Sequence, residues 1–258
     1  MFRAYLKYWW IAKDEHSIHS PFVFEFYQNV IKDKRSSYYA FAEIENLRKK
    51  LLQSQDWVEV EDFGAGSKKN KSPMRKVATI TKNATKNPQI AQMLFRLVNF
   101  LQPQTLLDLG TCLGITTSYL AKAAPKDAKI YTFEGAENLL NLAKKNTELL
   151  HIQSIDFVLG NIDETLPKVL KKITQVDFAF IDANHRYEPT KRYFELILEK
   201  TTENSVLIFD DIYWSEEMTK AWNEIKAHPK VQISIDLFWV GIVFFRNKQP
   251  KQHFTLKF

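Results

Sequence analysis

Short apolar runs alternate with amphipathic segments from residue 104 onward, and this alternation restricts the possible fold more than any other feature of the sequence. The runs are TLLDLG, KIYTFE, SIDFVLG, VDFAFID and SVLIFDD, and helical patterns such as ENLLNLAKKNTELL separate them. Continuous apolar runs joined by helices are typical of a parallel sheet that is covered on both faces. Two further runs, VQISIDLF and VGIVFFR, are too close together for a helical crossover and are predicted to pair as an antiparallel hairpin. The sequence therefore predicts an α/β fold with a doubly wound, mostly parallel sheet of seven strands, of which the last is antiparallel.

The first 103 residues have a different pattern. Four stretches show helical periodicity, and no strand pattern alternates with them. They are FRAYLKYWWIA, PFVFEFYQNVI with Pro21 at its start, YAFAEIENLRKKLL, and NPQIAQMLFRLVNFLQ after Asn87. We expect residues 1–103 to form a helical extension and residues 104–258 to form the α/β domain.

Composition narrows the setting and the possible partners. Cys112 is the only cysteine, so no intramolecular disulfide can form, and a reducing compartment is expected. No apolar stretch approaches the roughly 18 residues of a membrane span, and we expect a cytoplasmic protein without a membrane partner. The net charge of +6 would suit nucleic acid or an anionic ligand. The densest run of basic residues, KKNKSPMRK at 68–76, has no aromatic residue for base stacking and is interpreted as a solvated loop.

A glycine turn follows the first predicted strand of the α/β domain. In LLDLGTCLGITTSYLA, Gly110 and Gly114 lie between strand and helix, where a missing side chain lets the backbone approach a ligand. Glu134 ends the second strand, 24 residues after Gly110, where an acid can accept hydrogen bonds from both ribose hydroxyls. Cys112 interrupts the glycine pattern that cradles a pyrophosphate, so a nucleoside without phosphates fits better.

A second glycine motif occurs earlier, in VEVEDFGAGSKK, with Asp62, Gly64 and Gly66. No second strand ending in an acid follows it, and short glycine motifs often arise by chance. We therefore interpret it as a loop that could line a substrate entrance rather than as a cofactor loop.

These features resemble the class I S-adenosylmethionine-dependent methyltransferases, whose Rossmann-like fold contains an antiparallel strand near its end. The usual acid-x-Gly-x-Gly-x-Gly loop is DLGTCLG here, with Cys112 in place of the middle glycine. Small-molecule O-methyltransferases related to the catechol and caffeoyl-CoA enzymes share this departure, and they are similar also through Gly110, Gly114 and Thr116. The resemblance covers roughly residues 104–246.

The resemblance implies which residues bind the cofactor, S-adenosylmethionine. It assigns Asp108, Gly110 and Gly114 to the methionine end, counts Thr111 of the same turn among the cofactor-binding residues, and assigns Glu134 to the ribose. Asn161 in LGNIDETLP matches the position that contacts the adenine. Asn161 could instead cap the helix that is predicted to start at 162–163.

Acidic residues end two neighbouring strands of the predicted sheet. Asp182 follows the fourth strand, and Asp210 and Asp211 end the fifth. Parallel neighbours lie roughly 4.8 Å apart, so three carboxylates would share one small volume beside the cofactor's methyl group. Carboxylates that close disfavour mutual ionisation unless a cation compensates, and hard oxygen ligands select Mg²⁺ or a similar divalent cation. As neighbours, however, Asp210 and Asp211 could point to opposite faces, leaving one only to cap the next helix.

His185 follows Asp182 by three residues and adds a candidate base. Imidazole titrates near neutral pH, and a bound metal would lower the pKa of a substrate hydroxyl. The segment DANH resembles the D-G-x-H segment of metal-dependent sugar and macrolide O-methyltransferases, in which the Asp is a metal ligand and the His is the base. Asp182 and His185 are thus the predicted catalytic pair. The alternative is a surface histidine that is bonded to a neighbouring carboxylate.

Three functional hypotheses remain open. The first is metal-assisted O-methylation of a small hydroxylated molecule by a chain that could be a homodimer. The second is a catalytically silent binding module that keeps the fold. Nucleic-acid methylation is third, because the fourth strand ends in IDANH rather than [DN]-P-P-[YF], and the one cysteine lies in the glycine turn.

Overall fold

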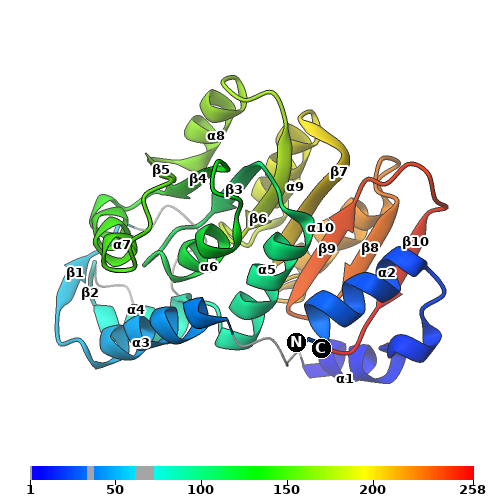
Figure 1. The fold of residues 1–258 in the computed structure, drawn as a ribbon, viewed down its shortest axis with the longest axis horizontal. Coiled ribbons are helices and arrows are strands. Elements are labelled where there is room, and N and C mark those ends of the chain that lie inside the picture. The colour runs from blue at the N-terminus through cyan, green and yellow to red at the C-terminus, as the bar shows by residue number, and fades with distance from the viewer. Residues whose placement is uncertain (1, 34–37, 62–72) are drawn as a thin grey trace. The chain divides into compact units, whose positions relative to one another are not determined.

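The computed structural model describes residues 2–33, 38–61 and 73–258 (Figure 1). The chain divides into two compact units, of which the first combines residues 1–32 with 167–258 and the second comprises residues 33–166. The predicted division into residues 1–103 and 104–258 stays a prediction about domains. Within the described ranges, no helix has the length and apolar character needed to cross a bilayer.

The second unit contains three parallel strands and the helices that connect or precede them. Strand β3 pairs with β4, and β4 pairs with β5, with Asp108 opposite Thr132 and Glu134 opposite Leu159. The elements are α3 (Tyr39–Gln53), β1 (Trp57–Glu59), β2 (Met74–Lys76), α4 (Val77–Ala84), α5 (Pro88–Leu101), β3 (Thr105–Leu109), α6 (Ile115–Ala123), β4 (Lys129–Glu134), α7 (Glu137–Leu149) and β5 (Ile155–Leu159).

The helical prediction for the N-terminal hundred residues is correct in most places and wrong in one. Helix α5 begins as predicted, because the Asn87 side chain accepts the Ile90 N–H at 2.9 Å and Pro88 occupies the first turn. Strands β1 and β2, however, form an antiparallel pair within the first 103 residues, where the sequence shows no strand pattern. Their three-residue length gave no period-2 signal. Part of the basic run that was interpreted as a loop is therefore strand β2.

The first unit contains five strands in the order β10-β8-β9-β7-β6. Strands β6 and β7 are parallel, and β9 runs antiparallel to both β7 and β8, which confirms the predicted hairpin. The elements are α1 (Phe2–Ile11), η1 (Glu15–Ser17), α2 (Pro21–Phe26), η2 (Tyr27–Ile31), β6 (Val176–Ile181), α9 (Tyr187–Leu198), β7 (Thr201–Asp210), α10 (Glu216–Ala227), β8 (Ile233–Asp236), β9 (Val240–Phe244) and β10 (Gln252–Thr255). Helix α8 (Ile162–Leu170) spans the boundary between the units.

Strand β10 adds an element that the sequence did not predict. It pairs in parallel with β8, and Lys13 forms a parallel bridge with Leu256 immediately after it. The Lys13 N–H donates to the Thr255 carbonyl, and the Lys257 N–H donates to the Lys13 carbonyl. The segment after α1 is thereby bonded to the last strand of the chain.

Aromatic side chains form much of the core of the first unit. The rings of Phe22 and Phe26 pack edge-on against Phe244 of β9, which attaches α2 to the strands. Trp222 of α10 is 1% exposed and lies against Gly241 of β9, where an added Cβ would stand 2.7 Å from the indole ring. Only glycine permits this close approach of helix and strand.

Candidate functional site

The glycine turn joins β3 to α6 in the second unit. Gly110 has φ 117° and Gly114 has φ 74°, and both values favour residues without a side chain. A Cβ at Gly114 would lie 3.1 Å from the Cβ of Ala143, so glycine also lets α6 begin close to α7. The N–H groups of Gly110 and Thr111 donate to the Phe133 carbonyl. The turn is therefore fixed to β4 through its backbone.

Cys112 occupies the place of the missing glycine and adopts a left-handed conformation, with φ 49°. Its side chain packs against a cluster that includes Leu113 and Leu139. That apolar contact offsets part of the cost that a Cβ incurs in this region of the backbone. Its N–H donates to the Glu134 carboxylate at 2.8 Å. The turn thus keeps the glycine-type backbone without the glycine.

Glu134 lies at the end of β4, as predicted, and its carboxylate is held by backbone N–H groups. Oε2 accepts from Cys112 and Oε1 accepts from Ala136, at 2.8 and 3.0 Å. A carboxylate has about four lone-pair sites, so two bonds leave capacity for further donors such as hydroxyl groups. The two bonds fix the carboxylate between the glycine turn and the start of α7.

Asp108 and Thr111 are both buried in the second unit, at 0% and 2% exposed. The Asp108 Oδ2 atom accepts hydrogen bonds from the hydroxyls of Thr117 and Thr132, at 2.6 and 2.8 Å. The Thr111 hydroxyl lies 2.6 Å from that of Thr132. These contacts give Asp108 and Thr111 a positioning role behind the turn, and their direct contact with a cofactor stays a prediction.

Thr117 and Thr132 hold Asp108 in place behind the glycine turn, and the sequence analysis missed both. Both are buried, and they link the Asp108 carboxylate to the turn and to β4. A threonine inside the KIYTFE strand reads as an ordinary strand residue. The register of β3 against β4, which sets Asp108 opposite Thr132, was not readable from the sequence.

Asn161 acts as a helix cap, in line with the alternative interpretation of its sequence. Its Oδ1 atom accepts the Asp163 N–H at 3.0 Å, at the start of α8. Its carbonyl also accepts the N–H of Thr165. Contact with an adenine ring stays a prediction for this residue.

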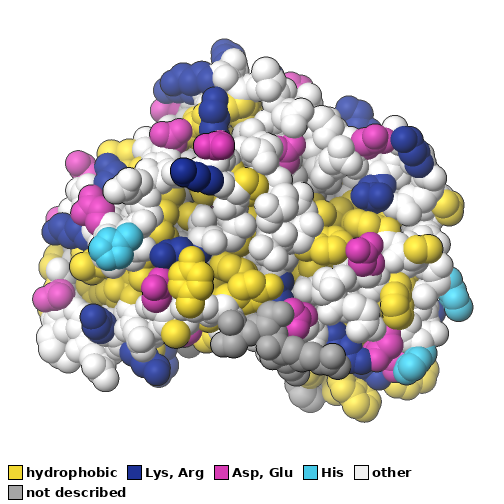
Figure 2. Space-filling view, viewed as in Figure 1, with side chains coloured by type: hydrophobic (Ala, Val, Ile, Leu, Met, Phe, Trp, Pro, Cys, Tyr) yellow, Lys and Arg dark blue, Asp and Glu magenta, His cyan; other side chains and the backbone are white. Residues whose placement is uncertain are grey.

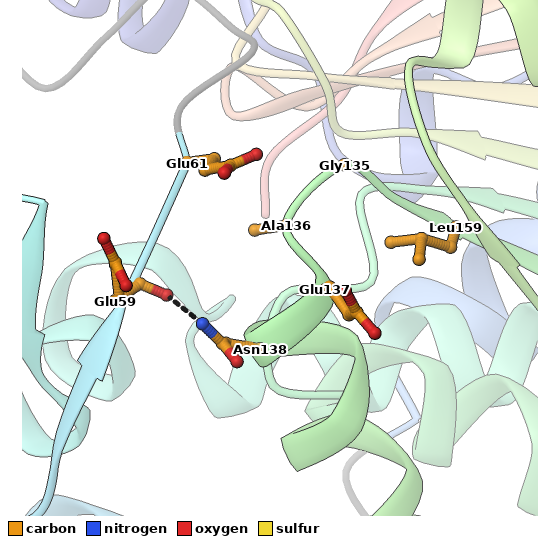
Figure 3. Close-up of a pocket in the computed structure, with 7 residues that line it drawn as sticks. All are labelled: Glu59, Glu61, Gly135, Ala136, Glu137, Asn138 and Leu159. Atoms are coloured by element: carbon orange, nitrogen blue, oxygen red, sulfur yellow. Dashed lines mark hydrogen bonds between the residues drawn. The ribbon is translucent and has the colours of Figure 1, made fainter.

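A pocket of about 240 Å³ begins one residue after Glu134 (Figure 3). Glu59, Glu61 and Leu159 line it together with the segment 135–138, which contains the turn after β4 and the start of α7. The Asn138 side chain donates to the Glu59 carbonyl at 3.1 Å and ties the two sides together. The pocket therefore gives access to the turn that holds Glu134. The second glycine motif, with Asp62, Gly64 and Gly66, lies outside the described residues.

The predicted acidic site lies in the first unit, at the ends of β6 and β7. Ligand atoms of Asp182, His185 and Asp210 all lie within 4.8 Å of one another, and among the described residues no other group of acids, His or Cys gathers in this way. The His185 Nε2 is 3.4 Å from the Asp182 Oδ1. Asp210 is 1% exposed, whereas His185 keeps 25% of its side chain exposed. We refer to Asp182, His185 and Asp210 as the acidic triad.

The donor set of the triad suits a divalent cation. Two carboxylate oxygens and an imidazole nitrogen are ligands that Mg²⁺, Mn²⁺ or Zn²⁺ accepts, and oxygen ligands lie about 2.0–2.6 Å from such ions. Atoms within 4.8 Å of one another can therefore share one ion. A buried carboxylate such as Asp210 also requires compensation of its charge in the ionised form.

The backbone around the triad adopts uncommon conformations at residues other than glycine. Asn184 and His185 have φ 65° and 38°, and Asp211 has φ 53°. The Asn184 side chain donates to the Tyr193 hydroxyl at 2.6 Å, which fixes the loop to α9. Asp211 is not part of the triad, and its N–H donates to the Trp239 carbonyl at 2.7 Å. Of the three predicted aspartate ligands, the structure thus brings Asp182 and Asp210 together, and metal binding by the predicted aspartates stays a prediction.

Another buried acid of the first unit, Asp236, has different partners. Its carboxylate accepts the Tyr213 hydroxyl at 2.5 Å and the Phe238 N–H at 2.9 Å. Burial raises the pKa of Asp236, and these two bonds lower it in part. The same burial and the neighbouring carboxylate raise the pKa of Tyr213. Asp236 is therefore satisfied by protein donors.

The glycine turn and the acid at the end of β4 are the features on which the predicted nucleoside site rests, and the acidic triad is the candidate cation site. Residues 107–212 match the family described as methyltransferase domain. This match confirms the resemblance to methyltransferases that the sequence predicted for this part of the chain.

Two curated relatives are O-methyltransferases or their homologues. A catechol O-methyltransferase of Niastella koreensis is 26% identical over 148 residues, which are 57% of this chain and 65% of the relative. A protein of Mus musculus described as a transmembrane O-methyltransferase homolog is 27% identical over 104 residues, which are 39% of this chain and 40% of that protein. The chain thus spans less than two thirds of the length of these relatives.

Solved methyltransferase structures share the fold. An O-methyltransferase of Bacillus cereus in complex with SAH has a TM-score of 0.58 and 16% identity, and the match covers 84% of this chain and 96% of that one. The SAH-bound methyltransferase PaMTH1 of Podospora anserina has a TM-score of 0.61 and 11% identity, with 89% and 97% covered. These likenesses confirm the predicted fold class, a mostly parallel Rossmann-like sheet with an antiparallel strand.

Proposed function

We propose that the chain transfers a methyl group from S-adenosylmethionine to a hydroxyl oxygen of a small molecule, assisted by a divalent cation. The observation that carries this proposal is the acidic triad at the ends of two adjacent parallel strands, in a chain that has a methyltransferase domain. A methyltransferase that acts on an oxygen has to remove a proton, and the triad supplies a base together with two carboxylates.

Residues of the second unit would hold the cofactor. The backbone of the turn from Gly110 to Gly114 would approach the methionine end, and Glu134 would accept hydrogen bonds from the ribose hydroxyls. Two observations support this assignment. The turn has the required positive φ values, and the Glu134 carboxylate is already oriented by two N–H groups. Because the Glu134 carboxylate is already oriented, less conformational entropy is lost when the cofactor binds.

Asp182 and Asp210 would hold the cation, with His185 beside them. When bound, the cation lowers the pKa of an acceptor hydroxyl and fixes the position of its oxygen. His185 is partly exposed and can reach a substrate proton, whereas Asp210 is buried and suits a ligand role. In the reaction, an O–C bond forms, the C–S bond of the sulfonium breaks, and the proton passes to the His185 imidazole. S-adenosylhomocysteine leaves as the neutral thioether.

The proposal is tested by calorimetric titration with S-adenosylmethionine in the presence and absence of Mg²⁺. A transfer assay with labelled cofactor and a panel of catechols, phenols and aliphatic alcohols then follows. We expect cofactor binding, transfer to at least one hydroxyl compound, and loss of transfer in excess EDTA. Absence of cofactor binding would overturn the proposal. Cofactor binding without methyl transfer to any hydroxyl compound would favour a silent binding module. Equal rates of transfer with and without EDTA would exclude a role for the cation.

A further inference from the structure

Helix α1 exposes more large hydrophobic side chains than any other described element. Five of the fourteen that are exposed among the described residues belong to it: Tyr5, Leu6, Trp9, Trp10 and Ile11. Trp9 is 66% exposed and Trp10 is 85% exposed. Figure 2 shows hydrophobic side chains at the lower edge of the molecule, where α1 lies in Figure 1. A patch that contains two exposed tryptophans calls for a partner, because isolated exposed apolar residues are common but clusters are not.

The opposite side of α1 is packed, so the helix is anchored with its tryptophans outward. Tyr8 and Ala12 are each 7% exposed and pack with Phe238. The Tyr8 hydroxyl donates to the Leu256 carbonyl, and the Tyr5 ring lies edge-on to Phe238 at 4.9 Å. Residues at 8 and 12 share one helical face, whereas Leu6 and Trp10 share another. Of the three consecutive aromatic residues Tyr8, Trp9 and Trp10, only Tyr8 is buried.

The charge of this segment is entirely positive. Residues 2–13 contain Arg3, Lys7 and Lys13 and no acidic residue. The two acids that follow are neutralised by other lysines, because Asp14 lies 4.0 Å from Lys257 and Glu15 is ion-paired with Lys32. Lys7 and Lys13 have no ion-pair partner within the part of the chain that the structure describes.

We propose that α1 docks onto an anionic membrane surface. Tryptophan has an apolar ring and one N–H donor and prefers the boundary between headgroups and acyl chains, while lysines beside it reach the lipid phosphates. Basic residues near such a surface are attracted by its negative potential. The helix lies on the bilayer rather than crossing it, which agrees with the absence of a spanning helix among the described residues. The expectation of no membrane partner rested only on the lack of a span.

A second copy of the chain fits this face less well. In a two-fold symmetric contact the same patch occurs on both sides, so Lys7 and Lys13 would face the lysines of the other copy. No acid of the segment is available to compensate them, because Asp14 and Glu15 already have lysine partners. An anionic lipid surface compensates the charge and buries the tryptophans at the same time.

The test is co-sedimentation of the full chain with vesicles. Two compositions are compared: phosphatidylcholine alone, and an equal mixture of phosphatidylcholine and phosphatidylglycerol. We expect binding to the mixed vesicles, a decrease with added salt, and a loss of at least tenfold in partitioning for the double variant Trp9→Ala, Trp10→Ala. The variant Lys7→Glu, Lys13→Glu should lose the preference for the anionic mixture.

The matched control is Trp57→Ala in the second unit. Trp57 is 57% exposed and has a lysine, Lys76, 5.6 Å from its ring, so it resembles the α1 tryptophans in exposure and charge. This control should bind vesicles like the wild type, and circular dichroism should show that all variants are folded. Failure of the wild type to bind mixed vesicles would overturn the proposal, as would equal binding by the double tryptophan variant. A dimer in light scattering that this variant converts to a monomer would assign the face to a second copy instead.

Discussion

Two kinds of turn at the ends of strands are built on opposite principles. The turn after β3 presents its backbone and uses Gly110 and Gly114 where φ is positive. The turns after β6 and β7 present side chains, and there the positive φ values belong to Asn184, His185 and Asp211. A side chain in the left-handed region costs free energy, and such strain is retained where it positions a functional group. The comparison teaches that glycine occupies the positive φ positions where the backbone is proposed to bind the ligand. Residues with side chains occupy them where the side chain is proposed to act.

The largest expected effect concerns His185. His185→Ala should lower the rate of methyl transfer by roughly 10²–10⁴-fold, the usual contribution of a general base. It should leave cofactor affinity unchanged, because the cofactor residues lie in the other turn. Single-turnover kinetics with labelled cofactor measure the rate, and the control is His151→Ala, an exposed histidine that also has a positive φ. If His185→Ala kept the full wild-type rate, His185 would not be the base.

Neighbouring aspartates separate the two roles after β7. Asp210→Asn should weaken Mn²⁺ binding by more than the roughly 10–100-fold that follows removal of an outer partner of a metal ligand. Asp211→Asn changes the same charge but lies outside the acidic triad and should bind Mn²⁺ like the wild type. Electron paramagnetic resonance of free Mn²⁺ measures the affinity of both variants for the ion. An equal loss of Mn²⁺ affinity in the two variants would mean that only the net charge of the site matters.

Glu134→Ala tests the backbone type of turn. Cofactor binding should weaken by about 1–3 kcal/mol, the scale of hydrogen bonds to a charged group. Glu148→Ala removes an exposed acid from α7 and is the control for charge. Calorimetry gives both affinities. If Glu134→Ala bound the cofactor with unchanged affinity, Glu134 would not bind the ribose. Its carboxylate would then only hold the backbone of Cys112 and Ala136.

Cys112 is the exception within the backbone turn, because it has a positive φ and a side chain. Cys112→Val places a β-branched residue at φ 49° and should destabilise the fold by about 1–3 kcal/mol. Cys112→Gly removes the strain but also the packing against the Leu113 cluster, so the two changes should nearly cancel. Urea denaturation gives the free energies of unfolding. A valine variant as stable as the glycine variant would show that the turn relaxes freely.

The smallest effect separates Asp236 from the acidic triad. Because burial raises its pKa above the ordinary 3.8, the folded state binds this proton more tightly than the unfolded state. Its contribution to stability is therefore full below pH 3.8 and is lost as the pH rises through the pKa of the folded state. The stability of the wild type relative to Asp236→Asn should fall over that range. A difference that is constant with pH in urea titrations would contradict the raised pKa.

The fold was largely predictable because its signals are local. Apolar runs and Asn87 with Pro88 mark strands and a helix start within a few residues. The approach of Asp182 to Asp210 was also predictable, since parallel strands bring their ends together. Which of Asp210 and Asp211 lies beside Asp182 was left open, because it depends on backbone φ values that the residue types do not require. The contacts of Thr117 and Thr132 were not predictable, because they depend on the register of β3 against β4. The β1 and β2 pair was not predictable either, because strands of three residues show no periodicity.

The bonding of Lys13 to Thr255 and Leu256 has a consequence for biosynthesis. Residues 1–32 leave the ribosome long before their partners around Thr255 and Leu256 in the same unit are translated. The unit formed by residues 33–166 is continuous and can fold during translation, since domains generally fold as units as they emerge. The nascent α1 segment must wait with Tyr8 and Ala12 unburied until Phe238 and Leu256 are made. During that interval it is a candidate for chaperone binding, and a truncated product would keep it exposed to proteases.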